Sequence, residues 1–387
     1  MSSTLLTGDA TSWRSRRTGV KWGLYDSEVL PLWVAEMDAE PCRPVVDAVG
    51  AAMSRGDTGY PLGGEFVEAG AAYAVDTWSW ALDQRRASPV ADVMIGLTEV
   101  LREVTDPGGP VVVSSPVYNA FFDFLDMSGR VVVDAPLTPA GRLDAEALDR
   151  AFAQARARAG RGSHALHGPA YLLCNPQNPT GTVHTREELE TLAALAASHD
   201  VTVISDEIHA PIVHEGTFTP YLTVAGGERG VSLLSPSKAW NLAGLKAALV
   251  VTGAEAPPGA TLHEVHSHGA SHLGQIAGIA AWTHGRDWLA TVTAEIDANR
   301  SLLARLLADR LPQIGFAVPA ATYLAWLDCR GLGLGDDPAV VFRERGRVAF
   351  SSGPSFGESG RGFVRVNLAT SPAILTEAVD RMVGALA

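Results

Sequence analysis

Four polar side chains, Lys238, Asp206, Asn178 and Tyr118, each follow a short apolar run that is typical of a buried strand. In open α/β sheets, ligands bind beyond the carboxyl ends of the strands. Taken singly, each residue has an ordinary explanation as a solvated charge, a helix cap or a turn residue. Together and in this order, they predict one site that combines an amine nucleophile with a carboxylate and an amide.

This combination suits the chemistry of pyridoxal 5'-phosphate (PLP). A lysine amine forms a Schiff base with the cofactor aldehyde, and a carboxylate keeps the pyridine nitrogen protonated so that the ring draws electrons from the substrate. Amides, hydroxyls and a cation hold the phosphate, and an arginine forks onto the substrate carboxylate. Residues 96–99 precede an expected helix, so their backbone N–H groups are candidates for binding the phosphate.

The elements that must position these residues are non-alternating apolar runs separated by helical patterns, as in a parallel sheet buried on both faces. The expected strands are 111–114, 130–134, 170–174, 201–205, 231–234 and 247–251. Thr185 and Glu188 fit a capping box at the start of a helix between two of these strands. The order of elements predicts a doubly wound α/β domain.

The last third of the chain predicts a smaller α+β part. Its expected elements are a helix near 297–311, a strand at 322–328, a helix near 338–345, a strand at 362–367 and a final helix from Pro372. We expect a large domain over 45–285 and a small domain formed by 1–44 and 286–387.

Composition narrows the class of protein. The 387 residues are 47% hydrophobic and carry a net charge of -13, which argues against nucleic acid or an anionic membrane as a partner. Three widely spaced cysteines suit a reducing compartment, and no secretory signal or membrane span is apparent, so we expect a soluble cytoplasmic protein. His263, Glu264 and His266 give HExH and not HExxH, so no metal site is expected.

Several motifs resemble those of the class I/II aminotransferase superfamily, the fold type I PLP enzymes. They are SPVY (115–118), NPQNPTG (175–181), SDEIH (205–209), SPSKAWNLAGLK (235–246) and GRGFVRVNLA (360–369). PLWVAEMDAEP (31–41), GYPLGG (59–64) and TYLAWLDCR (322–330) further resemble the MalY/PatB branch of cystathionine β-lyases and related C–S lyases. The resemblance runs from about Pro31 to the C-terminus.

The resemblance implies a role for each matching position. Lys238 would carry the cofactor and act as acid and base, Asp206 would pair with the ring nitrogen, and Tyr118 would stack on the ring. Asn178 would bind the ring hydroxyl and contact the substrate, and Arg365 would bind the substrate carboxylate. The further cofactor-binding residues would be Thr98 and Glu99 through their backbone amides, with His209, Ser235, Ser237 and Lys246.

The resemblance also implies a homodimer with shared active sites, because Tyr60 would reach the phosphate, and the substrate beside it, from a neighbouring subunit. Three positions call for comment. Glu36 stands where a shorter aspartate is usual, Lys246 stands where an arginine is common, and the Glu99 carboxylate must point away from the phosphate.

The implied reaction is β-elimination from cystathionine or another cysteine S-conjugate, which gives a thiol, pyruvate and ammonia. Two alternatives stay open from the motifs alone. One is an aminotransferase that uses the same cofactor, and the other is a regulatory PLP-binding protein that interacts with a transcription factor.

Overall fold

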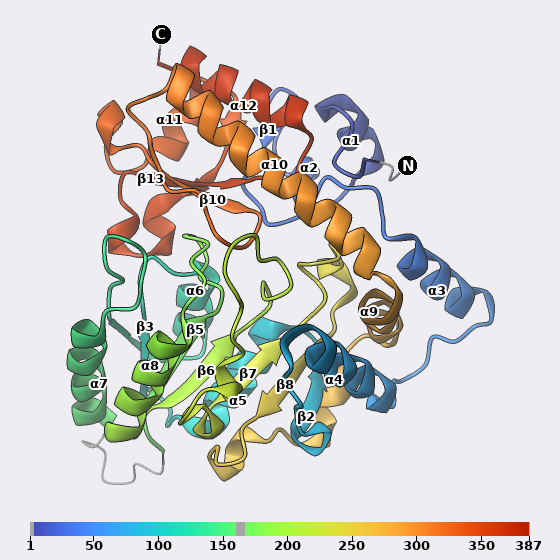
Figure 1. Ribbon diagram of the computed structural model, residues 1–387, viewed down its shortest axis with the longest axis vertical. Helices are drawn as coiled ribbons and strands as arrows, with labels where there is room; N and C mark the ends of the chain where they lie inside the picture. The colour runs from blue at the N-terminus through green and yellow to red at the C-terminus, as the bar shows by residue number, and fades with distance from the viewer. Residues whose placement is uncertain (1–3, 160–166, 387) are drawn as a thin grey trace.

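A seven-stranded sheet forms the centre of the protein in a computed structural model that describes residues 4–159 and 167–386 (Figure 1). The order of its strands is β2-β8-β7-β6-β5-β3-β4. These strands are β2 (Ala87–Val90), β3 (Pro110–Val113), β4 (Val131–Asp134), β5 (Ala170–Cys174), β6 (Thr202–Asp206), β7 (Val231–Leu234) and β8 (Ala248–Thr252). The five strands from β7 to β4 are parallel, and β8 runs antiparallel to both of its neighbours.

Helices cover both faces of this sheet, which explains why its strands are apolar without alternation. Val111 and Val113 of β3 pack with α5 (Val93–Val104) and α6 (Ala120–Met127) on one face. Val112 packs with α7 (Ala145–Ala159) and α8 (Arg186–Ser198) on the other face. The predicted doubly wound α/β domain is therefore confirmed.

A second, antiparallel sheet lies beyond the central one, with strand order β12-β13-β10-β9. Its strands are β9 (Gly315–Phe316), β10 (Leu324–Asp328), β12 (Ser351–Ser352) and β13 (Phe363–Asn367). Three helices lie in the same part of the fold (Figure 1): α10 (Arg286–Arg310), α11 (Pro338–Glu344) and α12 (Pro372–Gly384). This is the expected α+β part, although α10 begins eleven residues before the expected start at 297.

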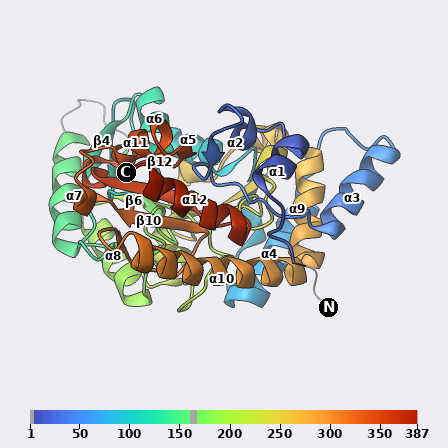
Figure 2. The same cartoon turned by 90° about the horizontal axis from the view of Figure 1, so that it is seen from above.

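The N-terminal segment joins this C-terminal part. β1 (Leu30–Pro31) pairs in parallel with β11 (Val348–Ala349), and the helices α1 (Ala10–Arg16) and α2 (Val20–Gly23) lie beside α12 in the view of Figure 2. The division at 44/45 and 285/286 stays a prediction, and the outermost residues of its small domain, 1–3 and 387, lie outside the described residues.

Three further helices complete the large part of the fold. The helices α4 (Gly64–Trp78) and α9 (His272–His284) pack together, and α3 (Arg43–Ser54) packs on α9 at the edge of the molecule (Figure 1). Thr185 and Glu188 form the predicted capping box at the start of α8.

None of the helices within 4–159 and 167–386 combines the length and apolarity that a bilayer crossing requires.

Candidate functional site

The parallel register of the central sheet brings the predicted residues to one edge. Cys174 at the end of β5 pairs with Asp206 at the end of β6, and Asp206 pairs with Leu233 of β7. The loops that follow these strands therefore start side by side. A cavity of about 120 Å³ opens there. Its lining includes the predicted residues Tyr118, Asn178, Asp206, His209, Ser237, Lys238 and Lys246.

Lys238 presents its amine to this cavity from the loop after β7. Burial is the main reason that the pKa of Lys238 falls to about 8, and the positive charge of Arg365 adds to the effect. With this lowered pKa, much of the amine is neutral near pH 8. The neutral amine is the nucleophilic form. The Nζ atom donates a hydrogen bond to the carbonyl oxygen of Ala35 at 3.0 Å.

Two more titratable groups line the same cavity. Asp206 is 5% exposed, and burial raises the pKa of its carboxyl to about 6. Its Oδ1 accepts a hydrogen bond from the Ile208 backbone N–H at 3.1 Å. Burial also lowers the pKa of His209 to about 3, so its imidazole is neutral at physiological pH. Among the described residues, His209 Nδ1 has no hydrogen-bond partner although it is buried.

Arg365 is a buried cation that does not itself line the cavity but contacts Asn178, which does. Its Nη1 donates to Asn178 Oδ1 at 3.0 Å, and its Nη2 donates to the Trp33 carbonyl and to Ser351 Oγ, both at 3.2 Å. Burial lowers its pKa to about 10, so it stays charged at neutral pH. No carboxylate of the described chain pairs with it, and Nε lacks a partner. A buried cation without a counter-charge is costly, so this arrangement favours an anionic ligand.

The structure corrects the prediction for Thr98 and Glu99. The helix α5 begins at Val93, so these residues lie more than one turn inside it and their amides are used in the helix. Thr98 Oγ1 donates to the Met94 carbonyl, and the Glu99 carboxylate pairs with Arg102 at 3.2 Å. Glu99 therefore lies outside the cavity, with its carboxylate held by Arg102.

Val93 and Met94 are the residues that line the cavity at the start of α5. Their backbone N–H groups belong to the first turn, where amides have no partner within the helix. Asp92 caps this turn by accepting the Ile95 N–H at 2.8 Å. An aspartate directly before an apolar helical pattern is a helix-start signal, and applying it to Asp92 would have found these residues from the sequence.

The remaining predicted residues differ in their placement. Lys246 lines the cavity, and its Nζ pairs with Asp92 Oδ2 at 2.7 Å. Ser237 also lines the cavity, whereas Ser235 supports the loop by donating its hydroxyl to the Ala247 carbonyl at 2.7 Å. Tyr60 is 87% exposed and does not line the cavity of its own chain.

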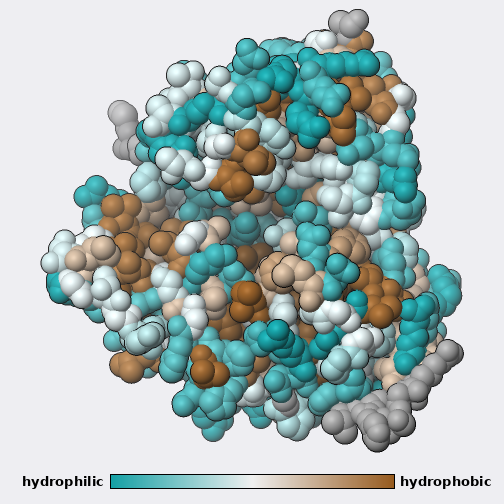
Figure 3. Space-filling view, turned by 180° about the vertical axis from the view of Figure 1, so that it is seen from behind, coloured by the Kyte–Doolittle hydropathy of each residue, from teal (hydrophilic) through white to brown (hydrophobic). Residues whose placement is uncertain are grey.

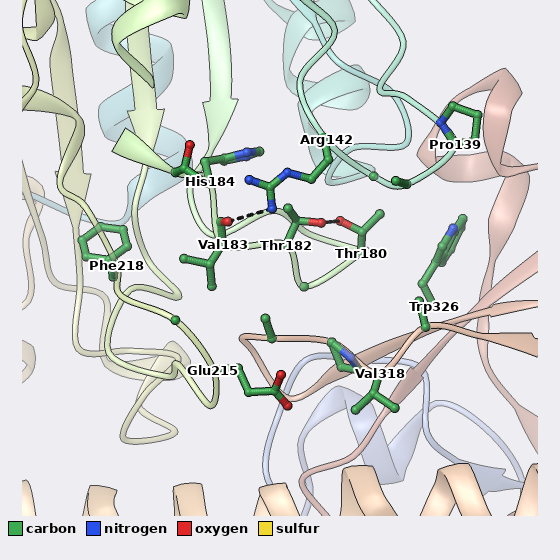
Figure 4. Close-up of a pocket in the computed structure, with 18 of the residues that line it drawn as sticks. Pro139, Arg142, Thr180, Thr182, Val183, His184, Glu215, Phe218, Val318 and Trp326 are labelled. Carbon is green, nitrogen blue, oxygen red and sulfur yellow. Dashed lines mark hydrogen bonds between the residues drawn. The ribbon is translucent and has the colours of Figure 1, made fainter. Parts of the chain in front are cut away.

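A second cavity is larger, about 1090 Å³, and lies between the two parts of the fold (Figure 4). Arg142 reaches toward it and donates to the Val183 carbonyl at 3.1 Å, while Glu215, Val318 and Trp326 face it from other segments (Figure 4). No lysine is among the described residues that line it. The larger cavity therefore lacks the amine that the predicted chemistry requires.

Comparisons with known proteins identify the family of the chain. The model of the family "Aminotransferase class I and II" matches residues 91–382. A Mycobacterium tuberculosis protein provisionally named a cystathionine beta-lyase is 49% identical, with 95% of each chain covered. The cystathionine beta-lyase PatB of Bacillus subtilis is 30% identical, with 96% of this chain and 95% of PatB covered.

A crystal structure from Corynebacterium diphtheriae is also similar, and it is provisionally described as a PLP-dependent beta-cystathionase. It superposes with a TM-score of 0.89 at 34% identity, with 99% of each chain covered. These likenesses extend over nearly the whole chain and include both parts of the fold. The chain belongs to the aminotransferase class I and II family and, within it, to the MalY/PatB branch of fold type I enzymes.

Proposed function

We propose that this protein is a PLP-dependent carbon–sulfur β-lyase that acts on cystathionine or another cysteine S-conjugate. The observation that carries the proposal is one cavity that holds the Lys238 amine and the Asp206 carboxylate, with the unpaired Arg365 cation directly behind Asn178. Relatives over the full length of the chain bear the name cystathionine beta-lyase. The products are a thiol, pyruvate and ammonia.

The residues of the cavity fit PLP. Lys238 would hold the cofactor covalently, Asp206 would face its ring nitrogen, and Tyr118 would cover its ring. The first-turn amides of Val93 and Met94, with Ser237 and the Lys246 ammonium, would hold the phosphate. Asn178 and His209 would lie beside the ring, where the buried His209 Nδ1 lacks a partner in the described chain.

Bound PLP supplies an electron-withdrawing ring that stabilises negative charge at the substrate Cα. The chain supplies the proton transfers and the binding groups. Asp206 keeps a proton on the ring nitrogen, and Arg365 fixes the substrate through its α-carboxylate. The Lys238 amine would take the Cα proton, the thiolate would leave from Cβ and take up a proton, and one water would hydrolyse the remaining three-carbon fragment to pyruvate and ammonia.

Changing Arg365 to lysine is expected to raise KM for the amino-acid substrate about tenfold or more and to change kcat less. Lysine keeps the charge but loses the planar fork that binds a carboxylate through two hydrogen bonds. Steady-state kinetics of thiol release measure the effect. Ser355→Ala is a suitable control, because within the described chain the exposed Ser355 Oγ bonds only the Ser352 carbonyl. An unchanged KM in Arg365→Lys would remove Arg365 from this role.

The rate at which PLP attaches to the cofactor-free protein is expected to rise with pH, with a midpoint near pH 8. Attachment needs the neutral amine, and burial lowers the pKa of Lys238 to about 8. Below that pH the ammonium predominates and attachment slows, whereas above it the neutral amine predominates. Stopped-flow absorbance of bound PLP between pH 6 and 10 measures the profile, and a midpoint near the free-lysine value of ~10.4 would contradict it.

The active protein is a homodimer with shared active sites in this proposal. Tyr60 is 87% exposed and Leu62 is fully exposed, and both lie in the segment between α3 and α4. Exposed apolar side chains often mark an interface. The face seen in Figure 3 also carries apolar groups around a central hollow. Changing Tyr60 to alanine should weaken PLP retention, and mixing it with Lys238→Ala chains should restore some active sites if the sites are shared.

We also propose a cytoplasmic location. Its support is that Cys42, Cys174 and Cys329 are all buried and free, which suits a reducing compartment.

Thiol release separates the lyase from an aminotransferase. The lyase is expected to release thiol and pyruvate continuously from L-cystathionine without a keto-acid acceptor. An aminotransferase would keep the C–S bond and release no thiol; it would convert cystathionine to its keto acid once per bound cofactor and continue only when another keto acid is added. A panel of cysteine S-conjugates, followed with a thiol reagent, then ranks the leaving groups.

A further inference from the structure

The loop Trp33–Asp38 passes over Lys238 and is held by side chains from other segments. Asn367 Nδ2 donates to the carbonyls of Val34 and Glu36 at 2.8 and 2.6 Å. Asn241 accepts from the Met37 N–H at 2.8 Å and donates to its carbonyl at 3.0 Å. The Trp33 carbonyl accepts from Arg365 and Ser351. The backbone of this loop is therefore fixed from several sides.

The centre of the loop touches the reactive amine. The Ala35 carbonyl oxygen accepts from Lys238 Nζ at 3.0 Å and from the Tyr323 hydroxyl at 3.0 Å. A neutral amine that donates one N–H to a fixed oxygen has two staggered directions left for its lone pair. The position of the Ala35 carbonyl thus restricts where the free amine of Lys238 points.

The end of the loop is anchored by a buried ion pair. Lys21 Nζ lies 2.8 Å from Asp38 Oδ2, and both side chains are only 2% exposed. Trp22 Nε1 donates to the other carboxylate oxygen at 2.8 Å. Lys21 Nζ also donates to the Glu36 carbonyl at 3.0 Å, one residue from Ala35. Removing one partner of such a pair would leave an uncompensated buried charge, so the pair must be tested as a unit.

We propose that Lys21 and Asp38 are positioning residues that aim the Lys238 amine through the Ala35 carbonyl. The inference rests on the proposed function, because the aimed amine is the one that would take the substrate proton. Neither Lys21 nor Asp38 lines the cavity, so both act only through the loop.

The test is the variant Lys21→Met with Asp38→Asn, which replaces the ion pair without changing the net charge. The new amide oxygen keeps an acceptor for Trp22, but the link to the Glu36 carbonyl is lost. Because the loop is then less firmly fixed, the hydrogen bond from the Lys238 ammonium to the Ala35 carbonyl is weaker. The midpoint pH of PLP attachment is expected to fall by about one unit, since a hydrogen bond to a charged group is worth that much. With the loaded enzyme, kcat should fall about tenfold while KM changes by less than about twofold.

The charged groups that act on Lys238 are Arg365, Glu36, Asp206 and Lys246. The variant replaces none of them, and Glu36 moves only with the loop to which it belongs. A change in the midpoint pH of PLP attachment therefore reports a change in the position of the loop Trp33–Asp38. Glu295→Gln is the matched control, because the Glu295 carboxylate anchors the N-terminal arm at the Leu5 and Leu6 amides and does not touch the loop. It is expected to leave the midpoint unchanged.

Trp22→Phe keeps both members of the ion pair, removes the hydrogen bond to Asp38 and replaces a buried indole with a smaller ring, so it is the second variant to test if the double variant does not fold. It should shift the midpoint in the same direction by a smaller amount. An unchanged midpoint in a folded double variant, or in Trp22→Phe where only that variant folds, would overturn the positioning role. The attachment assay needs no turnover, so its result is separate from the wild-type test of thiol release.

Discussion

Replacing Lys238 with alanine is expected to abolish covalent attachment of PLP and to lower turnover by about 10⁴-fold. The variant loses both the nucleophile that holds the cofactor and the base that takes the Cα proton, and positioned acid–base catalysis alone contributes up to about 10⁴. Borohydride reduction followed by peptide mapping locates the attachment site. The absorption spectrum of the unreduced protein shows whether a covalent imine is present, but not which lysine forms it.

Lys238→Arg is the matched control for charge. Arginine keeps a cation in the cavity but is always protonated, so it forms no covalent bond with the cofactor. Both variants are expected to bind PLP without a covalent bond. A reduced lysine adduct at another position in Lys238→Ala would contradict the assignment of the site.

Replacing Asp206 with asparagine is expected to lower kcat by about two to three orders of magnitude. Asparagine keeps the shape and the oxygen that accepts the Ile208 N–H, but it loses the charge that would hold a proton on the ring nitrogen. KM should change much less, because the substrate carboxylate is bound by Arg365. Steady-state kinetics with saturating PLP separate the loss of turnover from any loss of cofactor.

Glu207→Gln is the control for Asp206→Asn, because Glu207 is the next residue and is also a buried carboxyl. Its Oε1 accepts from the Tyr221 N–H at 2.8 Å and from Ser205 Oγ at 3.0 Å, and its side chain does not line the cavity. We expect kcat to stay within about tenfold of the unsubstituted protein. Equal losses in the two variants would show that burial of a carboxyl matters here and that the position of Asp206 does not.

Much of the fold could be predicted because its signals are local. The valine-rich run at 111–113 is buried on both faces of the sheet, and Thr185 caps α8 as its spacing with Glu188 indicated. The rule that ligands bind at the carboxyl ends of parallel strands predicts that Asp206, Asn178 and Lys238 lie together. The registers of β5 with β6 and of β6 with β7 show that the loops carrying them start side by side.

The parts that sequence reasoning missed depend on contacts between distant segments. Lys246 pairs with Asp92 across 154 positions, and the Ala35 carbonyl meets Lys238 across 203. A backbone carbonyl has the same chemistry at every residue, so no motif marks the one that binds the lysine. The error at Thr98 had a local cause. The sequence interpretation placed residues 96–99 before the helix, whereas α5 begins at Val93, directly after its capping residue Asp92.

The most direct test of the central claim is the stoichiometry of products from L-cystathionine with purified, PLP-loaded protein. We predict one pyruvate and one ammonia for each thiol released, over many turnovers, and no detectable release by Lys238→Ala. Covalent attachment of PLP at Lys238 without pyruvate, from cystathionine and from other cysteine S-conjugates, would contradict the lyase assignment.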